Sequence, residues 1–136
     1  MPYVLDCSVA LAWVLPDEHS AAVDLIADQL ERDRAYVPAI WPLEVGNALL
    51  VAQRRGRIPA LEVGKIVNAL MALPVEVDSE NAIARVPEWM ELAQRLALTT
   101  YDAAYVELAR RRSWPLATLD VKLRAACAIV QVPVVP

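Results

Sequence analysis

Four acidic residues in the sequence are surrounded by apolar neighbours and could together bind a metal ion. They are Asp6 after "YVL", Glu44 in "WPLEVGNALL", Asp102 in "LTTYDAAYVELA" and Asp120 after "ATL". A carboxylate among apolar residues is costly to bury unless a charge or a hydrogen-bond donor compensates it. Mg²⁺ and Mn²⁺ prefer oxygen ligands, and a divalent cation also offsets the repulsion between carboxylates. The four acids therefore predict a site for a hard cation.

The elements that would position these acids are predicted to be short strands that alternate with helices. Apolar runs predict strands at residues 3–5, 35–37, 75–77, 116–119 and 129–135. Helical patterns cover residues 20–34, 43–55, 58–73, 87–98 and 101–112. Pro87 is expected to divide the region around it into two short helices. This alternation predicts an α/β fold with a central, mostly parallel β-sheet flanked by α-helices.

The predicted topology brings the acids towards one edge of the sheet. In open parallel sheets, sites form outside the carboxyl ends of the strands, and Asp6 and Asp120 each follow a predicted strand. Glu44 and Asp102 lie near helix starts that could aim them at the same edge. Each acid also has a structural interpretation: Asp102 completes a Thr-x-x-Asp capping pattern, Glu44 favours the helix dipole, and the other two suit turns. The joint pattern favours the cation site.

Composition limits the class of protein. The 136 residues suit one domain, spanning residues 1–136, and the net charge of −4 argues against a generally basic nucleic-acid-binding surface. Local basic patches stay open, and Lys122 and Arg124 follow Asp120 closely. Hydrophobic residues make up 57%, which predicts an apolar patch covered by a second copy or a partner. No apolar run reaches the ~18–20 residues of a membrane span, and no basic leader precedes Asp6, so we expect a cytoplasmic protein without membrane association.

Other chemistries have few residues to support them. His19 is the only histidine, which makes a histidine-based zinc site or a catalytic triad improbable, and the three glycines form no nucleotide-binding loop. Cys7 and Cys127 are predicted to be buried free thiols. The strongest enzymatic rival, phosphoryl transfer through an aspartate after the first strand, normally has a second acid two residues later, where this sequence has Ser8.

Four segments in this order resemble the PIN-domain ribonucleases and, within them, the VapC toxins of type II toxin–antitoxin modules: "VLDCSVALAW", "LEVGNAL", "LTTYDAAYVELA" and "LATLD". The resemblance extends over nearly the whole chain. It implies a PIN-like fold and an endoribonuclease that hydrolyses RNA phosphodiester bonds with Mg²⁺ or Mn²⁺. It further implies a homodimer neutralised by a cognate VapB-like antitoxin. A non-toxin RNA-processing nuclease and a catalytically silent metal- or partner-binding module stay open as alternatives.

The resemblance also assigns roles to residues. It makes Asp6, Glu44, Asp102 and Asp120 the acidic quartet that binds metal and carries catalysis, with Asp6 and Asp102 as the direct metal ligands. Ser8 and Thr118 match polar positions that support the acids through hydrogen bonds. Asn47, one helical turn after Glu44, matches a recurrent asparagine. Trp114 departs from the pattern, because a glycine turn is common at its position.

Overall fold

Five parallel strands form one sheet in the computed structural model, which describes residues 1–80 and 82–136. The strand order is β3-β2-β1-β4-β5, and each neighbouring pair is parallel. The strands are β1 Tyr3–Leu5, β2 Ala35–Pro38, β3 Val75–Asp78, β4 Leu116–Ala117 and β5 Val134–Val135. The predicted α/β fold with a parallel sheet is thereby confirmed, and β1 lies at the centre of the sheet.

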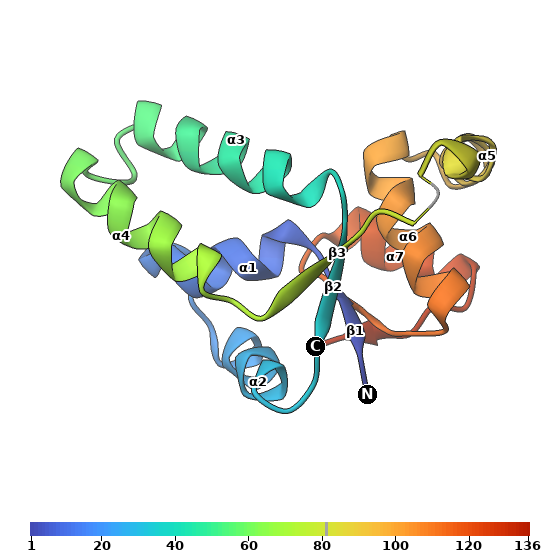
Figure 1. The fold of residues 1–136 in the computed structure, drawn as a ribbon, viewed down its shortest axis with the longest axis horizontal. Helices are drawn as coiled ribbons and strands as arrows, with labels where there is room; N and C mark the ends of the chain where they lie inside the picture. Colours follow the sequence, from blue (N-terminus) through green and yellow to red (C-terminus); the bar gives the residue numbers. More distant parts are fainter. Residues whose placement is uncertain (81) are drawn as a thin grey trace.

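Helices cover both sides of this sheet. The α-helices are α1 Cys7–Val14, α2 Ala21–Leu30, α3 Trp41–Arg54, α4 Ala60–Met71, α5 Val86–Leu96, α6 Thr100–Arg112 and α7 Val121–Ile129. In Figure 1, α1 to α4 lie on one side of the strands and α5 to α7 on the other. None of the helices in the described ranges is long and apolar enough to cross a membrane.

The helix boundaries follow from local signals in the sequence. Ser20 caps α2 by accepting a hydrogen bond from the Val23 amide at 3.3 Å. After α3 the chain turns at Gly56, whose φ of 73° suits glycine, as the sequence predicted. Pro87 lies in the first turn of α5, directly after the 3₁₀ helix Ala82–Arg85, so the predicted division of this region is confirmed.

Two predicted strands were too long. The strand expected at 129–135 is only Val134–Val135, because α7 continues to Ile129 and the chain turns at Gln131, with φ 60°. In this turn the Val132 amide donates to the Cys127 carbonyl at 2.9 Å, which returns Val132 to the core. The strand expected at 116–119 ends at Ala117, because the Leu119 amide donates to the Ser8 hydroxyl at 3.1 Å instead of to a strand.

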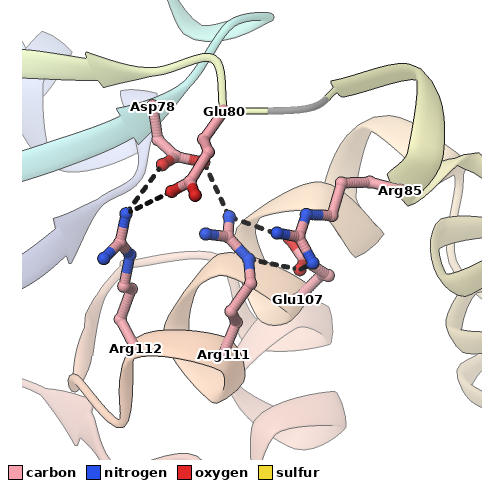
Figure 2. Close-up of polar contacts among 6 residues, drawn as sticks. All are labelled: Asp78, Glu80, Arg85, Glu107, Arg111 and Arg112. Atoms are coloured by element: carbon pink, nitrogen blue, oxygen red, sulfur yellow. Dashed lines mark hydrogen bonds and ion pairs between the residues drawn. The ribbon is translucent and has the colours of Figure 1, made fainter.

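A network of ion pairs, not anticipated from the sequence, ties the end of β3 to α6 (Figure 2). The Arg111 guanidinium donates to Glu107 at 2.7 Å and to Asp78 at 2.6 Å. Glu107 is 1% exposed, and the Arg85 guanidinium lies 3.8 Å from its carboxylate. Arg112 extends the network to Glu80 at 3.0 Å. Arg111 and Arg112 therefore neutralise acids within the fold.

We expect Arg111→Met to destabilise the protein, because Glu107 and Asp78 would lose their shared partner. Breaking a buried ion pair costs about 3–5 kcal/mol, and the loss should fall at the lower end because Arg85 and Arg112 still face the two acids. The free energy of unfolding from urea titration measures the effect. Arg110→Met is the matched control, since Arg110 is exposed and belongs to none of the ion pairs in the described residues. Equal losses in the two variants would contradict the role of the network.

Candidate active site

Asp6 lies at the carboxyl end of the central strand and is the most buried of the four acids. It follows β1 and caps α1, with its Oδ1 accepting a hydrogen bond from the Cys7 amide at 2.8 Å. Its Oδ2 accepts from the Ser8 hydroxyl at 2.7 Å and from the Thr118 hydroxyl at 2.8 Å. The residue is 6% exposed. These three donors fix the carboxylate in one orientation and supply the compensation that its burial requires.

Ser8 and Thr118 also connect the ends of two strands. The Ser8 hydroxyl accepts a hydrogen bond from the Leu119 amide at 3.1 Å, and the Thr118 hydroxyl accepts from the Asp120 amide at 3.1 Å. Each hydroxyl therefore donates to Asp6 while it accepts from the loop that follows β4. The structure thus brings the two predicted supporting residues to Asp6 and holds Asp120 on the same edge.

Asp120 caps α7, the helix that follows this loop. Its Oδ1 accepts hydrogen bonds from the amides of Lys122 at 2.9 Å and Leu123 at 3.1 Å. None of the hydrogen bonds in the described residues uses its Oδ2, and the residue is exposed. One oxygen thus orients the side chain, and the other can serve a ligand.

Glu44 and Asp102 come from the first turns of α3 and α6, as the sequence predicted. Both are half-buried. The Tyr105 hydroxyl donates to Glu44 Oε1 at 2.7 Å, and the Asp102 amide donates to the Thr99 hydroxyl at 3.1 Å. The latter bond is the capping interaction expected from the Thr-x-x-Asp pattern. The structural interpretations of these acids are therefore correct. The same helix starts also bring both carboxylates within electrostatic reach of Asp6, whose charge adds to the rise of their pKa values after burial.

Asn47 lies one turn beyond Glu44 on α3. It is exposed, and its side chain makes no hydrogen bond within residues 1–80 and 82–136. The structure therefore does not join Asn47 to the hydrogen-bonded part of the site.

The pKa values of three of the acids are raised. Burial is the largest cause for Asp6, for Glu44 and for Asp102. Negative charge adds to it: Asp120 raises the pKa of Asp6, while Asp120 and Asp6 both raise that of Asp102. Lys122 and Thr99 lower the pKa of Asp102, but burial and the neighbouring acids outweigh them. The carboxylates therefore repel one another across the site.

Cys7 lies within the electrostatic reach of all four acids. Burial raises the pKa of its thiol to about 12, and the charges of Asp6, Glu44, Asp102 and Asp120 add to the shift. The prediction that both cysteines are buried is confirmed for Cys127 but is wrong for Cys7, which is half-buried. Because the same thiol is affected by the four carboxylates, they converge on one region of the sheet edge.

The donor set fits a hard divalent cation in its chemistry. Four carboxylates supply oxygen ligands, and a cation between them would offset the repulsion between their charges. Within the part of the chain that the structure describes, no group of three or more His, Cys, Asp or Glu side chains is arranged to hold a metal ion. This arrangement is consistent with carboxylates that are bonded to separate helix starts and repel one another.

Two further residues support the site: Tyr105, which was not predicted from the sequence, and Arg124, which was expected near Asp120. Tyr105 was missed, although its position one turn after Asp102 on α6 places it near the same helix start. It is fully buried, and burial and its hydrogen bond to Glu44 raise its pKa above the usual value. Arg124, expected near the site, donates to the Thr118 carbonyl at 3.0 Å and to the Pro136 carbonyl at 2.9 Å. It therefore supports the loop after β4.

Comparisons with known proteins agree with this fold. The profile of the PIN domain family matches residues 3–129. The VapC ribonuclease Mb0985 of Mycobacterium bovis is 31% identical over 139 residues, which covers 96% of this chain and 98% of that protein. Among solved structures, PAE2754 from Pyrobaculum aerophilum superimposes with a TM-score of 0.71 at 23% identity, covering 93% of this chain and 84% of its own.

A second solved structure is that of a complex. VapBC2 from Rickettsia felis, bound to a DNA fragment from its promoter, superimposes with a TM-score of 0.68 at 12% identity, covering 98% of this chain and 97% of the other. At this level of identity, the likeness concerns the fold.

We expect Asp102→Asn to stabilise the metal-free protein at pH 7 and to change its stability little near pH 4. The pKa of Asp102 in the folded state lies above its value in the unfolded chain, about 3.9. The folded state therefore binds this proton more tightly, and the stability it contributes is lost as pH rises through the raised pKa. Asparagine cannot ionise and avoids this loss.

Thermal melts in EDTA at both pH values measure this effect as the difference between variant and wild type. Asp28→Asn is the control, because Asp28 is an exposed acid on α2 that belongs to no ion pair in the described residues. A melting temperature of Asp102→Asn that is lower by the same amount at both pH values would mean that Asp102 acts only as a helix-start residue.

Proposed function

This chain belongs to the PIN-domain family and, within it, to the VapC group, and from this premise we propose that it is an endoribonuclease that hydrolyses RNA phosphodiester bonds with Mg²⁺ or Mn²⁺. The observation that carries the proposal is the carboxylate of Asp6, which is held rigidly by Ser8 and Thr118 with three further acids around it. A protein that needed Asp6 only as a helix cap would have no use for acids that raise the pKa values of their neighbours.

In this proposal Asp6 and Asp102 bind the cation directly, and Glu44 and Asp120 complete the acidic set. When bound, the divalent ion lowers the pKa of a water molecule and stabilises the charge that develops on the phosphoryl group. Ser8 and Thr118 are positioning residues, because they hold Asp6 Oδ2 and do not themselves meet the substrate. The buried Tyr105 does the same for Glu44 Oε1.

Glu44 is the best candidate for the group that accepts the proton of the attacking water. Tyr105 occupies its Oε1 and leaves Oε2 unused by the hydrogen bonds of the described residues. Its raised pKa brings it nearer to the neutral pH at which a general base works best. Asp120 serves a different purpose, since one of its oxygens holds the start of α7.

The site also offers a cation for the RNA backbone. Lys122 is exposed and lies two residues after the residue that caps α7. It lowers the pKa of Asp102, so its ammonium lies within electrostatic reach of the acids. With a net charge of −4, the chain has little general attraction for RNA. Contact with phosphate therefore depends on such local cations and on the bound metal.

We further propose that the protein is the toxin of a type II module and forms a homodimer that a cognate VapB-like antitoxin neutralises. The name of the Mycobacterium bovis relative and the VapBC2 complex of Rickettsia felis support a partner of this kind. Large apolar side chains are exposed on the surface, including Leu61 at 96%, Ile83 at 89% and Val121 at 80%. Their exposure favours surfaces that a second copy or an antitoxin covers. RNA as substrate supports a cytoplasmic location without membrane association.

Purified protein is expected to cleave single-stranded RNA in Mn²⁺ or Mg²⁺ and to lose this activity in excess EDTA. Asp6→Asn and Asp102→Asn should each reduce the rate by at least about 100-fold, because each removes a charged ligand from the cation. Asp28→Asn should cleave like wild type. Gel analysis of a labelled oligoribonucleotide measures the rates. Cleavage that persists unchanged in EDTA would rule out the metal mechanism.

The proposed assembly predicts a sedimentation coefficient of a dimer at micromolar concentration. Co-expression with a VapB-like antitoxin should give a stable complex whose RNA cleavage is suppressed. A purely monomeric protein that retains full cleavage in the presence of the antitoxin would contradict the assembly and leave the nuclease proposal intact.

A further inference from the structure

An apolar cavity lies beside the candidate active site, between α3, α5 and α6. Its volume is about 350 Å³, within the range of roughly 300–1,000 Å³ typical of small-molecule sites. Its lining includes Ile40, Leu43, Trp89, Thr100, Tyr101 and Ala104. Neither the metal ligands nor the residues that position them line the cavity, so it is a feature separate from the acidic cluster.

The cavity and the acids share the same two helix starts. Leu43 directly precedes Glu44 on α3, and Tyr101 directly precedes Asp102 on α6. A ligand held at the acids by its phosphate would therefore have its neighbouring groups within reach of the cavity. This continuity indicates that both features serve one substrate.

Charge and polarity limit what the cavity can accept. The acids beside it repel an anionic group, so a second phosphate of the RNA backbone is disfavoured there. The side chains that line it are almost all apolar, and two large ones at its edge are well exposed, Leu43 at 71% and Tyr101 at 60%. A flat, uncharged and partly polar group suits such a lining.

The cavity also provides polar atoms in a small number. Thr100 contributes a hydroxyl. The Trp89 side chain also lines the cavity, but its indole N–H is buried and out of reach of a ligand held there.

We propose that this cavity binds one unpaired base of the RNA, in a nucleotide adjacent to the scissile phosphate, with the base stacked on Tyr101. The inference rests on the proposed ribonuclease activity and extends it to the specificity of that site. Single-stranded RNA is recognised chiefly through splayed bases that stack on aromatic side chains, and Tyr101 is an exposed aromatic residue directly before Asp102. Tyr101 is thereby a specificity residue and has no part in the hydrolysis itself.

The experiment compares Tyr101→Ala, Tyr101→Phe and wild type on an RNA oligonucleotide and on copies that carry an abasic nucleotide on either side of the cleaved bond. Tyr101→Ala should raise KM for the intact RNA by about 10-fold or more, whereas Tyr101→Phe retains the ring and should behave like wild type. On one of the abasic RNAs, wild type and Tyr101→Ala should have equal KM, because the base that stacks on Tyr101 is absent.

Met90→Ala is the matched control. Met90 is exposed to the same extent, 60%, and follows Trp89 without lining the cavity. Tyr101→Ala should fold normally, since alanine favours the helix more than tyrosine does. Equal effects of Tyr101→Ala on intact and abasic RNAs, or no effect on any, would overturn the proposal.

A second measurement separates this inference from the nuclease activity. RNA containing 4-thiouridine is photo-crosslinked to the protein in EDTA, and the crosslinked peptides are mapped by mass spectrometry. Crosslinks at residues 100–104 or 40–43 without any cleavage in Mn²⁺ would contradict the proposed function but support the base site. Normal cleavage with crosslinks only elsewhere would overturn the base site alone. If Tyr101→Ala cleaves normally but binds an antitoxin more weakly, the cavity holds a protein segment and the proposal is wrong.

Discussion

The site depends on one constraint, which is that a carboxylate must be hydrogen-bonded and oriented at the end of a buried central strand. Asp6 meets this constraint through three donors from its own helix start and from the loop after β4. Without the Thr118 hydroxyl, which comes from the loop directly after β4, Oδ2 would keep only the Ser8 bond. The parallel pairing of β1 with β4 is therefore a requirement of the site, because it brings Thr118 to Asp6.

The same constraint explains why the other acids lie at helix starts. A negative charge near a helix N-terminus is stabilised by the backbone dipoles, which makes an acidic cluster tolerable before any cation binds. Asp120, Asp102 and Glu44 each belong to such a start. Their structural roles and their proposed roles in metal binding are thus two uses of one placement. Burial is the largest cause of the raised pKa values of Asp6, Glu44 and Asp102, and repulsion between the acids adds to it.

Local patterns in the sequence predicted the five strands and five of the seven helices in the described residues, but not α1 or α7, because such patterns depend on near neighbours along the chain. The strand before Asp6, the helix cap at Thr99 and the turn at Gly56 all have short-range signals. The partners of these residues across the fold have none. That Tyr105 would meet Glu44, or that Arg111 would meet Asp78, follows only from packing between segments distant in the sequence. The alternating residues 129–135 also misled the strand prediction, since a helix end and a left-handed turn at Gln131 can carry the same pattern.

The hydrogen bond between Thr118 and Asp6 spans 112 residues of sequence. Such a contact can form only after the whole intervening chain has been made, and it adds the entropic cost of closing a long loop. During synthesis on the ribosome, Asp6 emerges early, but its carboxylate cannot be fully oriented until β4 has left the exit tunnel and paired with β1. A nascent chain therefore carries an incomplete site while it is still held on the ribosome, close to ribosomal RNA and its own message. The long sequence separation of this hydrogen bond thus delays completion of the proposed nuclease site until most of the chain has been translated.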